Sequence, residues 1–470
     1  MKNHKCICGE PTRRALLNAA IGAFASAGVS LAVPQAPRGM PGGTPQELPG
    51  GFKMNMRNST DDPRFVTPAE PVNSPIGAGK GIHAGRVTWA HDPKVAKWDG
   101  ETGNWWDDEA TDQQIIHAMM SGSLQSLTGE KNDKAAWNAL FRFFNHARGL
   151  KDSGYRPGEK IAIKLNSNQD RPGAWRMGSG MPSPQVVYSL LHQLITVAGV
   201  PGQDITFYDA SRYIGDPIYN RIRANQDPNF QAPRFMVSQR MAGNGRLEAL
   251  PDKSNPIRFS KPGVPTAYPP ECVTGAKYLI NLALGRAHTL MGVTATAKNL
   301  FGSIYFDGVG FMPRPVHDFA ARDLPMGSYN CLVDLMAHKH LGGKTLLYLV
   351  DFLYASESQN SRVTRFESFG NHWASSLLAS QDPVAIDSVT LDFVRNEPKA
   401  VECRGRPEVY MHEAALAEKP PSGTRYDPEQ DGNPVASLGV HEHWNNAAEK
   451  KYSRNLGKRQ GIELVRWPKA

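Results

Sequence analysis

The chain has 470 residues and a net charge of +8, with 40% hydrophobic and 21% charged residues. This composition is typical of globular proteins and excludes a chain that is disordered throughout. Its five cysteines are too few for a scaffold held together by disulfides. The basic residues are scattered and form no motif that reads bases, so we expect no nucleic-acid partner.

Residues 1–36 predict a signal peptide. Arg13 and Arg14 stand directly before an apolar stretch at 19–33, and a charged start followed by a short apolar region is typical of such peptides. The paired arginines indicate the twin-arginine route. We therefore expect the twin-arginine export machinery as a partner, a periplasmic or other extracytoplasmic location, and no stable membrane span in the mature protein. An uncleaved membrane anchor is the alternative.

Three further regions follow the signal. Residues 37–80 are rich in Pro and Gly and predict a linker. An α/β core is expected over 81–400, followed by a polar, loop-rich C-terminal extension over 401–470. The core begins with a predicted strand at 86–89 and a helix that Thr111 or Asp112 could cap. A second helix is predicted over 134–147, with its aromatic residues on one face.

From Lys160 onward, strands alternate with helices. A strand at 160–166, a helix at 184–198 and a strand at 204–209 form one βαβ unit. Ser183 suits the N-cap of that helix. The remaining predicted elements are strands at 277–282, 345–352 and 376–380 and helices at 293–300 and 383–394. This pattern predicts an α/β fold with a mostly parallel sheet flanked by helices.

Polar residues stand where the predicted strands end. In open parallel sheets, ligands bind beyond the carboxyl ends of the strands. The residues in question, strand by strand, are Lys164, Asn166 and Asn168, then Asp209, Ser211 and Arg212, then Asn281, Arg286 and His288, then Asp351 and Tyr354. We therefore expect a shared site at this edge, although a purely structural role for these loops remains the alternative.

Two neighbouring segments add to the expected site. The Gly-rich loop at 176–183 opens a helix, and Arg171 lies nearby, so free amides and cations there could hold an anion. The segment 285–302 is rich in small residues yet carries His288, Lys298 and Asn299. Small residues allow the backbone to approach a ligand closely.

These segments resemble the domain of unknown function 362 family over about residues 160–396. The resemblance is carried by the stretches at 161–166, 288–302, 333–335, 349–351 and 379–387. It implies an α/β domain whose family function is not established. It also places the family's recurrent polar positions at Lys164, Asn166, His288, Lys298, Asn299, Asp351, Asp382 and Asp387. Some relatives carry a ferredoxin module with clustered cysteines; this chain departs from that pattern, so no intrinsic iron–sulfur cluster is expected.

The histidines leave a metal site open as a hypothesis. The pairs at 317–318 and 441–443 have ligand chemistry, and two histidines with one carboxylate would suit iron, zinc or nickel. No His-Glu-x-x-His motif is present. Because the twin-arginine route exports proteins that are already folded, often with a cofactor, a divalent metal is a further expectation, while the identity of any cofactor is open.

Two functions of different classes follow. The first is an enzyme that acts on a small anionic compound, a carboxylate or a phosphate, with or without help from a metal. Its expected catalytic residues are His288, Lys298 and Asp351, and its expected binding residues are Lys164, Asn166, Asp209, Asn299, Asp382 and Asp387. The second is a non-catalytic periplasmic protein that uses the same pocket for ligand binding or assembly.

Overall fold

The computed structural model describes residues 71–168, 170–175, 180–403 and 405–468, together with the backbone of two short paired strands, β1 (Gln46–Glu47) and β2 (Lys53–Met54). The predicted signal peptide and most of the predicted linker lie outside the described residues. Within the described part of the chain, no helix combines the length and the hydrophobicity needed to cross a membrane.

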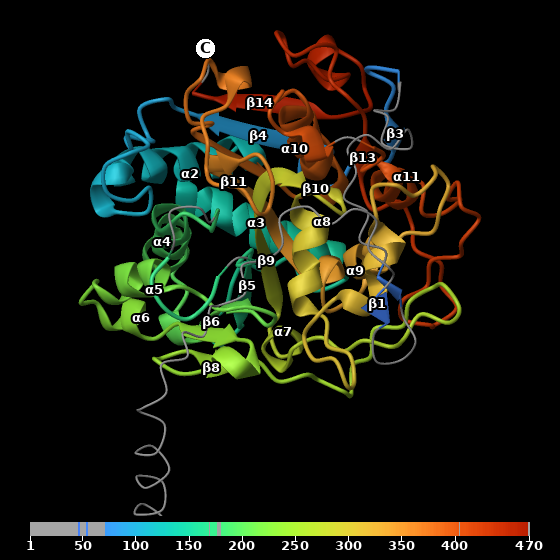
Figure 1. Ribbon diagram of the computed structural model, residues 1–470, viewed down its shortest axis with the longest axis horizontal. Helices are drawn as coiled ribbons and strands as arrows, with labels where there is room; N and C mark the ends of the chain where they lie inside the picture. Colours follow the sequence, from blue (N-terminus) through green and yellow to red (C-terminus); the bar gives the residue numbers. More distant parts are fainter. Residues whose placement is uncertain are drawn as a thin grey trace, which may run out of the picture. The chain divides into compact units, whose positions relative to one another are not determined.

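The centre of the fold is a ten-stranded sheet in the order β14-β4-β12-β11-β9-β5-β6-β7-β8, with β10 paired to β9 (Figure 1). β12 runs antiparallel to β11 and β4, and β10 runs antiparallel to β9, whereas the other pairs are parallel. The sheet is therefore mixed and mostly parallel. Its strands are β4 (Arg86–His91), β5 (Ile161–Leu165), β6 (Ile205–Asp209), β7 (Arg234–Val237), β8 (Leu247–Glu248), β9 (Tyr278–His288), β10 (Gly292–Thr294), β11 (Thr345–Ser356), β12 (Ser376–Ser380) and β14 (Glu463–Trp467).

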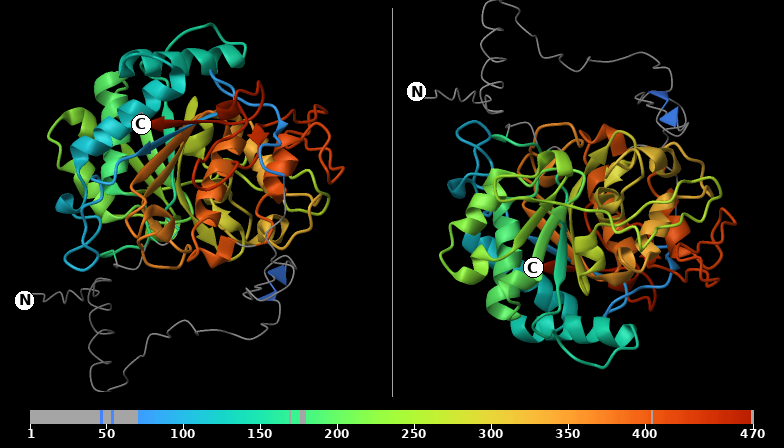
Figure 2. Two further views of the ribbon diagram at one scale, coloured as in Figure 1. Left: turned by 90° about the horizontal axis from the view of Figure 1, so that it is seen from above. Right: turned by 90° about the horizontal axis from the view of Figure 1, so that it is seen from below.

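Helices cover both faces of this sheet (Figure 2). One face carries α2 (Gln113–Thr128), α3 (Asp133–Ala147), α4 (Pro184–His192), α5 (Asp216–Arg223) and α6 (Pro228–Gln231). The other carries α8 (Thr296–Asn299), α9 (Cys331–Ala337), α10 (Pro383–Arg395) and α11 (Val409–Ala415). The short helix α7 (Glu271–Thr274) directly precedes β9.

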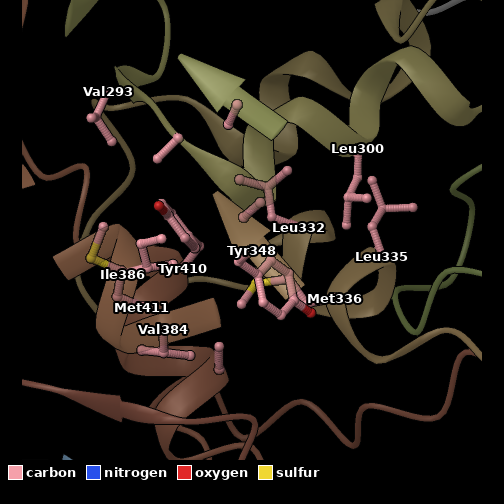
Figure 3. Close-up of a cluster of buried hydrophobic side chains, with 14 of the residues drawn as sticks. Val293, Leu300, Leu332, Leu335, Met336, Tyr348, Val384, Ile386, Tyr410 and Met411 are labelled. Atoms are coloured by element: carbon pink, nitrogen blue, oxygen red, sulfur yellow. The ribbon is translucent and has the colours of Figure 1, made fainter. Parts of the chain in front are cut away.

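The apolar sequence of the strands follows from burial on both faces. Ile161 and Ile163 of β5 belong to the core beneath α2–α5, and Ala162 between them belongs to the core beneath α8–α11, as expected where successive side chains point to opposite faces. Figure 3 shows part of the second core, where Leu332 of α9 and Ile386 of α10 lie among other buried side chains. Since both faces are covered, the strands read as continuous apolar runs.

The chain changes direction in the sheet between β5 and β9. From β5, the strands β6, β7 and β8 follow one another outward on one side, whereas β9 and then β11 lie on the other side. The connecting helices accordingly lie on opposite faces of the sheet. This reversal creates a crevice at the carboxyl ends of β5 and β9, the place where open α/β sheets bind ligands.

Most predicted elements are confirmed within a few residues, including the capping of α2 by Asp112, whose side chain accepts from two backbone amides. The helix predicted at 293–300 is present, but its predicted start is wrong. Gly292, with φ of 75°, opens a short hairpin strand instead, and α8 begins only at Thr296. Ser183 does precede α4, but its side chain makes no cap hydrogen bond. The helix predicted over 184–198 is α-helical only as far as His192. A π-helical turn follows it over 193–197.

Residues after 400 take part in the same sheet and its surroundings. β14 extends the sheet beside β4, and β13 (Val440–His441) pairs with β3 (Ile76–Gly77). The three cysteines at 272, 331 and 403 are free thiols, of which the last two are buried.

Candidate functional site

A cavity of about 340 Å³ lies at the carboxyl ends of β5, β6 and β9, where the strand order reverses. β5 contributes Lys164 and the following Asn166, β6 contributes Asp209, and α8 contributes Lys298 and Asn299. The long strand β9 contributes Arg286 and His288; they are two residues apart and so point to the same face of the strand. The remaining lining residues are Asn168, Arg171, Ser211, Arg212, Leu290, Thr294, Phe301, Gly302, Met312, Pro313, Arg314, His317, Gln359 and Asn360.

The charges around this cavity are strongly unbalanced. Among the described lining residues, the one carboxylate is Asp209, whereas the cationic side chains are Lys164, Arg171, Arg212, Arg286, Lys298 and Arg314. Like charges gathered in a recess with low-dielectric walls raise the local potential and attract counter-ions. The described lining therefore carries a surplus of positive charge.

A fixed polar network forms the floor of the cavity. Lys164 Nζ donates to Asp209 Oδ2 at 3.1 Å and to Asn299 Oδ1 at 3.2 Å. Asn299 in turn donates from Nδ2 to Asn281 Oδ1 at 2.8 Å. Both members of the Lys164–Asp209 ion pair are at most 4% exposed. This network ties β5, β6, β9 and α8 together, so it sets the position of the residues above it.

Backbone groups complete the environment of Asp209. Its carboxylate accepts from the amides of Ser167 at 3.0 Å and Ser211 at 3.1 Å. Burial alone would raise the pKa of Asp209, but the Lys164 ammonium and the Ser167 amide lower it overall, so the side chain is ionised. A Cβ at Gly302 would lie 2.6 Å from both Asp209 Oδ1 and Lys164 Nζ, and only glycine leaves room for the pair.

Arg286 is a buried charge of the site that is only partly compensated. The residue is 1% exposed, and Nη1 donates to the carbonyl of Gly180 at 2.7 Å. Its Nε and Nη2 atoms find no hydrogen-bond partner among the described residues. Burial lowers the pKa of Arg286 to about 10, which still leaves it charged at neutral pH. A buried guanidinium without partners is costly, and an anion in the cavity would supply the missing acceptors.

The hydrogen bonds of His288 assign the tautomer of its ring. Nδ1 accepts from the backbone amides of Leu290 at 3.1 Å and Met291 at 3.2 Å. Nδ1 therefore carries no proton, and a neutral ring must hold its proton on Nε2. Burial, together with the neighbouring charge of Lys298, lowers the pKa of His288 well below its ordinary value. His288 is thus a neutral hydrogen-bond donor, whereas the sequence pattern suggested a proton carrier.

Lys298 has a pKa near neutrality. Burial, followed by the charges of Arg212, Lys164 and Arg286, lowers the pKa of its ammonium to about 7. Its Nζ lies 4.7 Å from the centre of the Phe301 ring. Burial and the charge of Lys298, which lower the pKa of His288, also lower the pKa of His317, to about 3. At neutral pH, Lys298 can therefore gain or lose a proton, while both histidines stay neutral.

Three predicted site residues lie outside the cavity lining. Asp351 accepts from the amides of Ser183 at 2.7 Å and Leu353 at 3.0 Å, and so fixes the start of α4. Asp382 caps α10 at the opposite edge of the sheet. Asp387 accepts from both the amide and the hydroxyl of Thr296, at 2.8 and 2.6 Å, and so anchors α8. All three carboxylates accept hydrogen bonds from backbone amides. Asp387 affects the site only indirectly, because it fixes α8, which carries Lys298 and Asn299.

The strand-end rule did not select four other cavity residues, although the sequence had marked the 317–318 pair as possible metal ligands. Arg314 and His317 come from the 3₁₀ segment Arg314–Ala320, and Gln359 and Asn360 follow β11. They reach the cavity through loops, whose course the strand-end rule does not describe. The predicted anion loop at 176–183 lies partly outside the described residues, but Gly180 from its far end contacts Arg286.

The metal hypothesis finds no donor set in the part of the chain that the structure describes. There, no group of three or more His, Cys, Asp or Glu side chains is placed to hold an ion. In particular, the cavity places His288 and His317 beside cations, an environment that disfavours a further positive charge.

Comparison with known proteins bears on this same region. No curated protein matches the sequence. Residues 161–392 match the model of the family described as "Domain of unknown function (DUF362)". All residues that line the cavity fall within this range. The part of the chain that builds the candidate site is therefore the part that matches this family model.

Proposed function

We propose that the cavity binds a small anionic compound, a carboxylate or a phosphate, and that the protein is an enzyme that moves a proton to or from it. The observation that carries this proposal is Arg286, a buried guanidinium in the cavity wall with two N–H groups unpartnered among the described residues. A bound oxyanion would accept from both groups and would offset the surplus of positive charge.

The cavity divides the work between binding and proton transfer. Arg286 and the Nε2–H group of His288 are donors for the anion, while the Lys164–Asp209 pair is already satisfied and keeps the floor in place. Lys298 is the proton carrier, because an amine whose pKa is about 7 exists in both forms at neutral pH. The anion itself would raise the pKa of Lys298 by adding a nearby negative charge.

Binding is tested first, by calorimetry with sulfate, phosphate and small carboxylates. We expect Arg286→Met to weaken anion binding by roughly 100-fold, since two hydrogen bonds to a charged group are lost. Unchanged binding in this variant would contradict the site.

Proton transfer is tested with the bound carboxylates. In D₂O, NMR should show exchange of the hydrogens next to the carboxylate with wild-type protein, and none with Lys298→Met, which should still bind the ligand through Arg286. Binding without exchange in the wild type would contradict the enzyme and leave the second candidate.

That second candidate is a non-catalytic ligand-binding or assembly protein. One observation favours it: the cavity's carboxylate, Asp209, is fully occupied by Lys164 and backbone amides, so it is not free to act as a base. The proton-exchange experiment separates the two candidates because both require the same anion contacts.

We also propose that the protein is exported through the twin-arginine route and works outside the cytoplasm. The support is the Arg13–Arg14 pair directly before an apolar stretch. Replacing both arginines with lysine should retain the full-length protein in the cytoplasm in a cell fractionation experiment. Unchanged export would contradict this route.

A further inference from the structure

A second cavity of about 590 Å³ adjoins the first. Four residues line both cavities: Arg171, Ser211, Arg212 and Met312. The two recesses therefore share a wall, and a ligand that fills the inner one can extend past this wall into the outer one. We call them the inner and the outer cavity.

The outer cavity differs from the inner one in chemistry. Besides the polar residues Ser238, Gln239, Arg240 and Glu248, it has a largely apolar side formed by Met241, Leu250, Pro251, Tyr305, Val309, Phe311 and Met312. The Tyr305 and Phe311 rings meet edge to face with their centres 5.3 Å apart. Leu250 is 47% exposed, so its side chain is accessible to a ligand in this recess.

The apolar side is anchored in the fold. Phe311 packs with Ala210 and Ala249 in a small buried cluster, and Tyr305 packs against that cluster. Ala210 directly follows β6, and its amide donates to the carbonyl of Gly302 in the inner cavity at 3.1 Å. The aromatic wall and the anion-binding wall are thus held at a set spacing by the same strand end.

Arg212 lies in the wall that the two cavities share, and its side chain is held in place by hydrogen bonds. Its Nε donates to the Asn168 carbonyl at 2.9 Å, and Nη2 donates to Asn168 Oδ1 at 3.2 Å. Nη1 donates to the Ser211 carbonyl at 2.9 Å and contacts Met312 Sδ at 3.4 Å. Because these contacts hold the guanidinium in one place, Arg212 offers charge to the inner cavity without closing the outer one.

We propose that the ligand of this site has two parts: an anionic head that enters the inner cavity and an aromatic or apolar body that lies against Phe311, Tyr305 and Leu250 in the outer cavity. This inference rests on the proposed anion-binding function and specifies its substrate class. A bare oxyanion would leave the outer apolar side in water, whereas an ester or acid with a ring would cover it.

The experiment compares anions with and without a ring on the same head. Calorimetry with the full chain measures orthophosphate against phenyl phosphate, and acetate against phenylacetate. Partial burial of one ring predicts a gain in affinity of roughly tenfold for the matching pair. Whether the gain occurs in the phosphate pair or in the carboxylate pair identifies the head group.

Variants assign the gain to the outer cavity. Phe311→Ala should remove most of the advantage of the ring and leave the affinity for the bare anion unchanged. Leu250→Ser should reduce that advantage more weakly; since Leu250 is exposed, this variant is expected to fold even where Phe311→Ala does not. Arg286→Met should weaken the binding of both members of a pair.

The outcomes separate the two proposals. If bare anions bind but the ring adds nothing in either pair, the two-part ligand is overturned and the anion site stands. A gain that survives in both outer-cavity variants overturns the two-part ligand as well. If none of the four anions binds, the anion site itself fails, and the inference fails with it.

Discussion

The two edges of the sheet treat buried charge differently. At the edge where the parallel strands begin, Lys344 donates to the carbonyls of Val273 at 2.7 Å and Ala276 at 2.6 Å. At the same edge, Asp382 accepts from four backbone amides, among them Ala385 and Lys80, both at 2.8 Å. At the edge where the strands end, Arg286 keeps two nitrogens without partners among the described residues.

This difference separates a buried charge whose partners are all supplied by the fold from one that the described residues leave partly unpaired. Lys344 and Arg286 are both nearly inaccessible cations, at 6% and 1% exposure. Burial lowers the pKa of Lys344 to about 8. Its ammonium is nevertheless satisfied by the carbonyls of Val273 in α7 and of Ala276 just before β9, and so joins these elements to the start of β11. Among the described residues, Arg286 donates to one carbonyl only, that of Gly180. Burial of a charge alone is therefore a weak indicator of function; burial without partners is the stronger one.

The largest expected effect is the difference in stability between variants that lack Lys344 and variants that lack Arg286. Lys344→Met leaves buried carbonyls unpaired and should lower the free energy of unfolding by about 3 kcal/mol. Arg286→Met leaves the carbonyl of Gly180 without its donor, which lowers stability, but it also removes a partly uncompensated buried charge, which raises stability. We expect these two effects to offset each other largely. Urea unfolding without added anion measures both. Equal destabilisation by the two substitutions would contradict the distinction between the edges.

Two buried aspartates offer a matched pair. Asp387→Asn weakens the contacts that hold the start of α8, and Asp382→Asn weakens the cap of α10 at the other edge. Each should cost about 2 kcal/mol of stability. Only Asp387→Asn should also weaken sulfate binding, by several-fold, because α8 carries Lys298 and Asn299. Unfolding curves and calorimetry on the same samples distinguish a local effect on the site from a general loss of stability.

The contrast also shows how far the sequence could predict the molecule. The βαβ pattern predicted the sheet, and the strand-end rule placed Lys164, Asn166, Asp209 and His288 at one edge of it. The segment 285–302 added Lys298. Periodicity is a local property, and the rule that parallel strands end at the same edge then brought these residues together. The pattern could not tell a carboxylate used by backbone amides, such as Asp351, from one that faces a ligand. That distinction depends on which loop folds over which strand end.

Long-range pairing set the other limits. β12 was expected as a strand, but its antiparallel direction follows from its partners β4 and β11, which lie far away in the sequence. This direction places Asp382 at the edge opposite the cavity. The extension of β9 to His288 likewise depends on pairing with β10, and it carries Arg286 into the cavity wall.

Lys298 should make the free energy of unfolding depend on pH. Its folded-state pKa, about 7, lies below its ordinary value of 10.5. Below pH 7 the amine is charged in both states, and the folded protein bears the full cost of burying it. Between pH 7 and 10.5 the folded state releases the proton first, so that this cost declines as the pH rises. Lys298→Met should therefore raise the free energy of unfolding by about 1 kcal/mol at pH 6 and by less at pH 9.5. A gain that does not vary with pH would show that Lys298 does not titrate in this range.

The smallest expected effect is the pH dependence of anion binding itself. Sulfate keeps its charge between pH 6 and 9, so any change in its affinity over this range reports on the protein. As the pH rises through the pKa of Lys298, the site loses one positive charge, and wild-type affinity for sulfate should fall several-fold.

In Lys298→Met the affinity should be lower at pH 6 and nearly constant up to pH 9, because Arg286, with a pKa of about 10, stays charged. Lys344→Met, whose ammonium lies at the other edge and is not part of the cavity lining, should keep the wild-type pH profile. A fall in affinity that persists in Lys298→Met would assign the titration to another group and remove Lys298 from the role of proton carrier.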